Sequence, residues 1–231
     1  MRILAIESSS LAGTVSLLKD GIVLDQINLN PHQRSAQSLA KGIRAQLEST
    51  QWSVRDVDLV TVAQGPGSFT GLRVGVTTAK VLAYVTNANL IGVNTLEVIA
   101  AQAPRSIRRV EAVLDAHRNQ LFAATFQRQD DGELATLKAT EIVGLAHWLD
   151  HLDPTSTVTG PGLKKVEQQI GPQIRVLDRA LWTPQATSVG RLGYREFQSG
   201  RRDNLWEFVP QYYRPSAAEE RLAKREGAER G

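Results

Sequence analysis

Cysteine is absent from this 231-residue sequence, and methionine occurs only once. The lack of cysteine excludes disulfide bonds, thiolate zinc sites and a cysteine nucleophile. Apolar runs are short and interrupted, whereas a span across a bilayer needs roughly 20 apolar residues. The chain begins with a strand-like stretch, RILAI, instead of the basic start and apolar core of a signal peptide. We therefore expect a cytoplasmic protein.

An excess of one charge is also lacking, since 27 basic residues face 24 acidic ones and the net charge is +3. Such a balance does not indicate a surface built to coat nucleic acid. The denser basic stretches, 105–109 and 201–202, have no interleaved aromatic residues on which bases could stack. With 42% hydrophobic and 22% charged residues, the composition is that of an ordinary globular protein.

Catalytic constellations are scarce in the sequence. His147 and His151 are four residues apart, so on a helix they would share one face, a geometry that can bind zinc. However, no glutamate follows His147 as a metalloprotease base would, and no further ligand lies nearby in the sequence. The pattern favours a solvated helix face. We expect no metal site and no catalytic residue.

The order of strand-like and helix-like segments indicates an α/β protein whose mixed sheet carries helices. In the first half, period-two alternation predicts strands, and apolar residues spaced three and four apart predict helices. A Lys-Asp-Gly turn joins the second and third strands as a hairpin. The predicted strands are 2–9, 13–21, 22–29, 56–65 and 89–95, and the predicted helices are 32–49, 69–86 and 96–103.

After Pro104 the pattern starts again with two strands inside 110–134, joined by a tight turn at 116–119. The segments that follow are predicted as helix 141–152, strand 155–162, helix 163–170, strand 174–178 and helix 187–200. Because each half opens on strand, turn and strand, we predict two related subdomains. They are an N-terminal one, 1–103, and a smaller C-terminal one, 104–231, with a charged tail from about residue 216.

A glycine-rich stretch at 65–76, GPGSFTGLRVGV, lies between a predicted strand and a predicted helix. Backbone N–H groups at such a helix start favour an anion, such as a phosphate. The stretch lacks the Gly-Lys-Ser/Thr ending of a P-loop and the three-glycine spacing of a dinucleotide site. A purely structural turn therefore stays open as the alternative. The serine-rich turn after Glu7 is a second phosphate candidate, with an ordinary polar hairpin turn as its alternative.

Small residues recur inside the helix that follows, at Gly71, Gly75 and Ala79. Their four-residue spacing puts them on one face, where they let another backbone approach closely. Since a glycine in a helix costs about 1 kcal/mol relative to alanine, two of them call for a compensating contact. That contact is either the protein's own sheet or another chain, and the spacing does not choose between them.

Six stretches of the chain carry a family pattern. They are ILAIESS, GTVSLL, GPGSFTGLRVGVTTAKVLAY, IGVNTLEVIA, LDAHRNQLFAATF and the closing VPQYYRPSAAE. Together they resemble the TsaB (YeaZ) family of bacterial tRNA threonylcarbamoyladenosine biosynthesis proteins, densely up to about residue 125 and sparsely between 135 and 205. The resemblance implies an actin-like ATPase fold, shared with sugar kinases, heat-shock seventy proteins and actin. It also implies a non-catalytic relative of TsaD, the enzyme that transfers threonylcarbamoyl to the adenosine next to the tRNA anticodon.

Members of this family pair with TsaD and help to recruit the small ATPase TsaE, so tRNA is reached indirectly, through the complex. Two N-terminal helices from each chain make the contact, and here they correspond to 32–49 and 69–86. The resemblance thus implies a partner interface at His32, Ala36, Leu39, Ala40, Ile43, Phe69, Gly71, Leu72, Gly75, Val76 and Ala79. On this assignment the helix glycines serve the partner, and Gly75→Arg should break the complex while leaving the fold intact. A homodimer through the same face is the expectation when the partner is absent.

The sequence departs from working enzymes of this fold at two places. TsaD carries a metal-binding His-x-x-x-His after the strand that corresponds to IGV, whereas residues 94–98 contain no histidine. A vestigial nucleotide site is implied at Glu7, Ser8, Ser9 and Asp115. Glu7 replaces an aspartate there, and the turn 115–118 lacks the glycine and hydroxyl of a phosphate loop. We expect no ATP hydrolysis by this chain alone and leave ATP or ADP binding open. A stand-alone ATPase or a metallopeptidase-like enzyme is the alternative.

Overall fold

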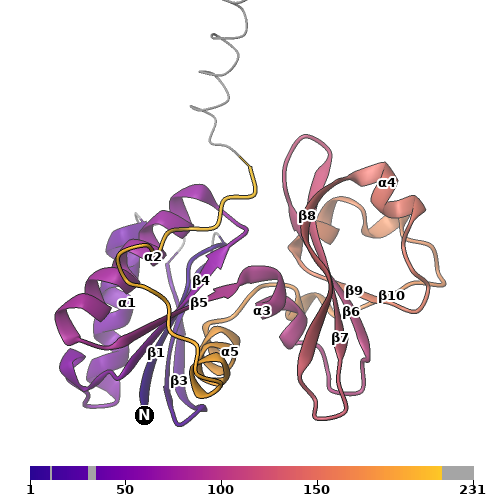
Figure 1. The fold of residues 1–231 in the computed structure, drawn as a ribbon. Helices are drawn as coiled ribbons and strands as arrows, with labels where there is room; N and C mark the ends of the chain where they lie inside the picture. Colours follow the sequence, from indigo (N-terminus) through magenta and orange to yellow (C-terminus); the bar gives the residue numbers. More distant parts are fainter. Residues whose placement is uncertain (11, 31–34, 215–231) are drawn as a thin grey trace, which may run out of the picture.

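The computed structural model describes residues 1–10, 12–30 and 35–214, which form two five-stranded mixed sheets (Figure 1). The first sheet contains β1 (Arg2–Glu7), β2 (Thr14–Lys19), β3 (Ile22–Asn28), β4 (Leu59–Gly65) and β5 (Asn89–Asn94). Its strand order is β3-β2-β1-β4-β5. β1 is antiparallel to β2 and parallel to β4, and β4 is parallel to β5.

The residues of β1 show why this segment is a central strand. Leu4 and Ile6 pack on one face of the sheet and Ile3 packs on the other, and all three are fully buried. This period of two suits a strand whose two faces are both covered by helices. The neighbouring β2–β3 hairpin closes through Asp20 and Gly21, both with positive φ, as the Lys-Asp-Gly turn predicts.

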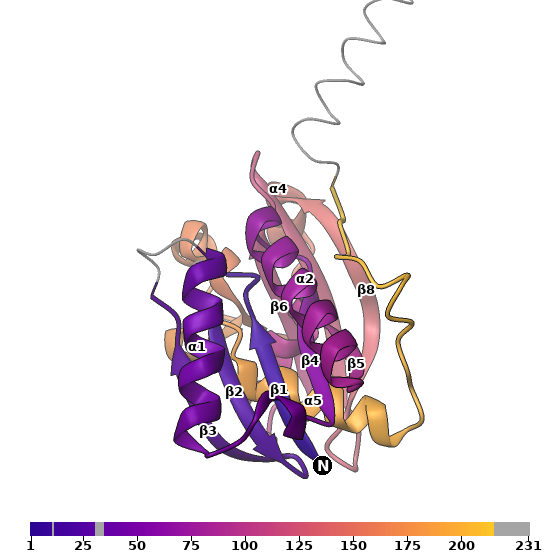
Figure 2. The same cartoon turned by 90° about the vertical axis from the view of Figure 1, so that its left-hand side faces the viewer.

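Four helices pack on the first sheet: α1 (Ser35–Ser49), α2 (Phe69–Thr86), α3 (Thr95–Ala101) and α5 (Ala186–Gln198). α1 and α2 lie side by side on one face, where Leu39 and Val76 pack against Leu4 (Figure 2). α5 covers the other face, with Val189 against Ile3. Among the described residues, no helix is long and apolar enough to cross a membrane.

The second sheet repeats the arrangement of the first. Its strands are β6 (Arg109–Asp115), β7 (Gln120–Arg128), β8 (Leu134–Gly144), β9 (Thr157–Thr159) and β10 (Arg175–Val176). Read from the other edge, the strand order is β8-β7-β6-β9-β10, which corresponds to β3-β2-β1-β4-β5 in the first sheet. Strand β6 takes the place of β1, and β9 takes the place of β4. The pairing directions agree as well, since β6 is antiparallel to β7 and parallel to β9. The predicted α/β fold with two related sheets is confirmed.

Helix α3 joins the two sheets. Leu96 and Ile99 belong to a core that includes Val110 and Phe122 of the second sheet. Val98 faces the other way, into the core that α5 shares with the first sheet. The helix therefore lies between the two sheets and packs on both (Figure 1).

Of two helices predicted in the second half, one is shorter than predicted and the other is wrong. The segment predicted as helix 141–152 begins as strand β8, which pairs with β7 and leaves only the short α4 (Leu145–Asp150). Most of β8 is half-buried or exposed at a sheet edge, so its sequence lacks the apolar row of an inner strand. The segment predicted as helix 163–170 forms two 3₁₀ turns, η2 (Pro161–Lys165) and η3 (Glu167–Gln169). Two further 3₁₀ turns are η1 (Val54–Asp56) and η4 (Arg179–Leu181).

The boundary predicted at residue 104 needs a correction at the C-terminal side. Ala186, Val189 and Leu192 of α5 pack on the first sheet, so the chain returns there after η4. Residues 201–212 follow and also lie along the N-terminal subdomain (Figure 1). The C-terminal subdomain is thus an insertion between α3 and α5. The charged tail predicted from about 216 lies outside the described residues.

Candidate functional site

The two turns that are phosphate candidates lie against each other. The N–H of Ser68 donates to the carbonyl of Ser9 at 2.8 Å, and the hydroxyl of Ser8 donates to the carbonyl of Gly71 at 2.9 Å. Ser68 also caps α2, because its hydroxyl accepts the N–H of Gly71 at 3.3 Å. The start of α2 is thereby anchored on the end of β1.

Gly71 and Gly75 are the residues that allow this close approach. A Cβ atom on Gly71 would meet the carbonyl oxygen of Ser8, and one on Gly75 would meet the Ser8 hydroxyl, both well inside 3.0 Å. Real Cβ atoms essentially never come so close to another heavy atom. The contact that compensates for the two helix glycines is therefore made within this chain, with Ser8 at the end of strand β1. Their assignment to a partner chain is wrong, and Gly75→Arg cannot leave the fold intact.

Most other residues predicted for the partner interface are buried in this chain's own core. They are Leu39, Ile43, Leu72, Val76 and Ala79. Ala36 and Ala40 are exposed, Phe69 is half-buried, and His32 lies outside the described residues. The apolar stripe of each helix was located correctly, but the chain's own sheet covers it. A partner that docks on these helices would meet their opposite side.

The opposite side of α2 carries a second apolar row, made of Val81, Tyr84 and Val85, which we call the outer face of α2. All three are more than half exposed. The ring of Tyr84 meets that of Trp206 edge-on, with the ring centroids 5.6 Å apart. Clustered exposed apolar side chains mark interaction sites. Sequence reasoning missed this row, although α2 is apolar on two sides, whereas a surface helix usually keeps one side polar.

A cavity of about 920 Å³ lies between the two subdomains. Its walls are the β1–β2 turn, the start of α2, the β6–β7 turn, the start of η2 and residues 211–214. Of the predicted nucleotide-site residues, Ser9 and Asp115 line this cavity. Glu7 and Ser8 lie behind the wall and are buried. The fold thus brings all four predicted residues to one place, from two subdomains.

Glu7 is a fully buried carboxyl group held by its own turn. It accepts hydrogen bonds from the N–H and hydroxyl of Ser9 and from the hydroxyl of Ser10. Burial raises the pKa of Glu7 to about 7, and the serine hydrogen bonds only partly oppose this. Near neutral pH the group is therefore divided between its protonated and ionised forms.

Asp115 sits on the opposite wall in a different electrostatic setting. Its carboxylate forms an ion pair with Lys165 at 2.7 Å and accepts the N–H of His117 at 2.9 Å. Burial alone would raise the pKa of Asp115, but the contacts with Lys165 and His117 outweigh it and lower the pKa. His117, Arg118 and Asn119 all have positive φ, which confirms the predicted tight turn. Three residues with side chains therefore occupy positions whose backbone conformation favours glycine.

The histidine pair lies away from the cavity, on α4. The rings of His147 and His151 are tilted by 31° with their centroids 4.0 Å apart, and Nδ1 of His151 lies 2.8 Å from the carbonyl oxygen of His147. Within the described part of the chain, no three His, Asp or Glu side chains are grouped closely enough to hold a metal ion. The pair has no third ligand among those residues.

Comparison with known proteins gives the family. A family model described as "TsaD: tRNA N6-adenosine threonylcarbamoyltransferase" matches residues 29–219. The chain belongs to this family. The tRNA threonylcarbamoyladenosine biosynthesis protein TsaB of Bacillus subtilis is 31% identical over 153 residues, 66% of each chain. The TsaB of Escherichia coli is 35% identical over 134 residues, which are 57% of this chain and 58% of that relative.

Two solved structures are similar to this chain over most of its length. A Pseudomonas aeruginosa protein described as similar to peptidase YEAZ is 25% identical, with a TM-score of 0.80 over 92% of this chain and 99% of that one. YeaZ from the same organism shares the fold at 23% identity, also with a TM-score of 0.80, over 91% and 99% of the two chains. The predicted resemblance to TsaB (YeaZ) is confirmed. In sequence, the chain spans two-thirds or less of the length of these two TsaB relatives.

Proposed function

We propose that this chain is a non-catalytic subunit in the cytoplasmic formation of threonylcarbamoyladenosine on tRNA. It binds a TsaD-type catalytic subunit, and the pair recruits a TsaE-type ATPase and meets the tRNA. The observation that carries the proposal is the outer face of α2, an exposed apolar row on a member of a tRNA-modifying family. The relatives named as biosynthesis proteins for this modification support it.

The docking surface that we propose combines α1 and the outer face of α2, which stand side by side (Figure 2). α1 contributes the small exposed residues Ala36 and Ala40, which let another helix approach closely. Tyr84 supplies the aromatic anchor that interface centres favour. Lys41 and Glu48, also exposed on α1, would form the polar rim. The same surface would serve a homodimer when the partner is absent.

The non-catalytic role is supported by what residues 94–98 do in the fold. In TsaD the matching stretch would carry the two metal-binding histidines. Here Asn94 caps α3, and Leu96 and Val98 are buried in the two cores beside that helix. The stretch carries no histidine, and its one carboxylate, Glu97, forms an ion pair with Arg195 at 2.9 Å.

We further propose that this chain alone does not hydrolyse ATP. The cavity between the subdomains is the place for a nucleotide, and ATP or ADP remains a proposed ligand there. The Asp115–Lys165 ion pair and the side chains of the β6–β7 turn stand where a second phosphate loop would act. Incubation of the purified chain with ATP should release no phosphate above background. If the wild-type chain hydrolysed ATP and Glu7→Gln did not, the result would instead favour a stand-alone enzyme.

Replacing Tyr84 by aspartate should weaken binding to the TsaD-type subunit by about 30-fold or more. The charge would be desolvated at the interface, whereas in the free chain the side chain is 63% exposed and the fold tolerates it. Isothermal titration calorimetry with the purified catalytic subunit measures this affinity. Leu137→Asp is the matched control, because Leu137 is 51% exposed on β8 in the other subdomain. Equal affinities for Tyr84→Asp and wild type would contradict the assigned face.

A further inference from the structure

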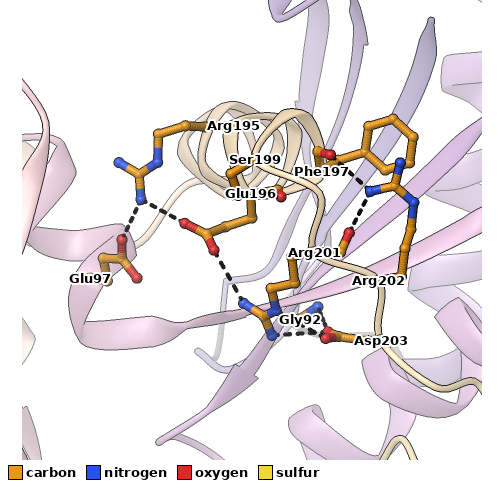
Figure 3. Close-up of polar contacts among 9 residues, drawn as sticks. All are labelled: Gly92, Glu97, Arg195, Glu196, Phe197, Ser199, Arg201, Arg202 and Asp203. Atoms are coloured by element: carbon orange, nitrogen blue, oxygen red, sulfur yellow. Dashed lines mark hydrogen bonds and ion pairs between the residues drawn. The ribbon is translucent and has the colours of Figure 1, made fainter.

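The segment after α5, residues 201–214, is here called the strap, and it begins on the edge of the first sheet. The carboxylate of Asp203 accepts the N–H of Gly92 in the edge strand β5 at 2.8 Å (Figure 3). Phe208 packs over Gly92, where an added Cβ would meet the phenylalanine ring. The N–H of Gln211 then donates to the carbonyl of Gln64 at 2.8 Å. The first part of the strap is thus fixed to the N-terminal subdomain.

The last part of the strap crosses the cavity to the other subdomain. The ring of Tyr212 stacks on Phe69 at the start of α2, with centroids 4.0 Å apart. The ring of Tyr213 meets Phe122 of β7 edge-on at 6.2 Å. The guanidinium of Arg214 donates to the carbonyl of Ala116 and to the side chain of Gln120, both at the β6–β7 turn. Residues 211–214 are therefore one wall of the cavity and also a tie across it.

Asn94 adds a polar junction beneath this tie. Its side-chain oxygen caps α3, and its amide group donates to Tyr213 at 3.1 Å and to Thr140 of β8 at 3.0 Å. α3 itself packs on both sheets, so it is the natural pivot between the subdomains. The strap lines the cavity through residues 211–214.

A second tie holds the other end of the C-terminal subdomain. Arg195 of α5 forms ion pairs with Glu97 of α3 and with Glu133, which lies between β7 and β8. Figure 3 shows Arg195 between Glu97 and Glu196. Strand β7 is therefore held near its start by Arg214 and beyond its end by Arg195. Only the first of these ties closes the cavity.

We propose that the strap is a latch that keeps the two subdomains closed around the cavity, and that release of Tyr213 and Arg214 opens it about α3. The latch is made of a few polar bonds and one ring contact, and the net contribution of each such bond is small compared with the free energy of folding. The fixed part of the strap would stay in place, because Asp203, Phe208 and Gln211 contact only the N-terminal subdomain in the contacts described above.

The cysteine-free chain allows a direct test with paired labels. Spin labels at Gln37→Cys on α1 and Gln168→Cys on η3, both exposed, report the distance between the subdomains by double electron–electron resonance. Arg214→Ala and Tyr213→Ala should lengthen and broaden the distance distribution. The matched control, Glu207→Ala, changes an exposed residue of the same strap and should leave the distribution as in wild type. A wild-type distribution in both latch variants would overturn the proposal.

Hydrogen exchange gives an independent readout of the same latch. The N–H of Ala116 bonds to Gln120 within the β6–β7 turn, and Arg214 holds both residues. Loss of Arg214 should speed exchange at this turn by about tenfold. If Arg214→Ala does not fold, Arg214→Lys keeps the charge and should give an intermediate distribution and rate. The latch would be contradicted if Arg214→Lys and Tyr213→Ala both showed the exchange rates and the distance distribution of the wild type.

Discussion

Replacing Gly71 by alanine should lower the free energy of unfolding by about 2 kcal/mol. Alanine is the better helix former by about 1 kcal/mol, so a solvent-exposed glycine at this position would give the opposite sign. Here the added methyl group meets the backbone carbonyl of Ser8, which the β1–β2 turn holds in place. The steric cost therefore outweighs the helix propensity. Urea unfolding followed by circular dichroism measures the difference.

Two further glycines make this experiment selective. At Gly75 the added methyl group meets the Ser8 hydroxyl, a side-chain atom that can rotate away, so Gly75→Ala should cost less than Gly71→Ala. At Gly144 an added Cβ meets no atom of the described residues within 4 Å, so Gly144→Ala should be nearly neutral. If Gly71→Ala were as stable as wild type, the glycine would not be required by the contact with β1.

The stability of the protein should depend on pH through Glu7. The fold raises the pKa of this carboxyl from 4.5 to about 7, so the folded state favours the protonated form. A raised pKa of this kind contributes stability that is fully present below pH 4.5 and is lost as the pH rises through about 7. The difference between the two pKa values corresponds to about 3 kcal/mol at most.

Glu7→Gln isolates this contribution, because glutamine stays neutral and keeps an oxygen that can accept the Ser9 hydrogen bonds. The unfolding free energy of wild type minus that of Glu7→Gln should fall as the pH is raised from 4.5 through about 7. Titrations of other groups occur in both proteins and cancel in this difference. Glu207→Gln, at an exposed position, should follow wild type at every pH. A difference that does not change with pH would refute the buried, protonated Glu7.

Local sequence patterns were sufficient to predict most strands, turns and helices of the N-terminal subdomain. The alternation in β1, the Asp20–Gly21 turn and the apolar stripes of α1 and α2 all depend on residues close in sequence. The repeated opening of strand, turn and strand likewise revealed two related halves. These features follow from backbone geometry, which puts neighbours in sequence on defined faces of a strand or helix.

The candidate site was predictable only in part. Glu7, Ser9 and Asp115 lie at the ends of predicted strands, and the fold does gather them around one cavity. The strap and the outer face of α2 were missed, although the strap carries Tyr212, Tyr213 and Trp206 in a short stretch. Their roles depend on elements more than a hundred residues away, such as Asn94 for Tyr213.

The sequence by itself determined which residues are apolar, where most turns fall and which family the chain resembles. Only the tertiary structure decided what covers each apolar stripe. The stripe of α2 can pack on a sheet or on a partner with the same side chains, and local spacing carries no information on which surface is nearer. Gly71 approaches Ser8 closely, so the apolar stripe of α2 is buried on the first sheet and no partner can contact it. In the same way, α5 returns to the first sheet and buries its apolar residues on the other face.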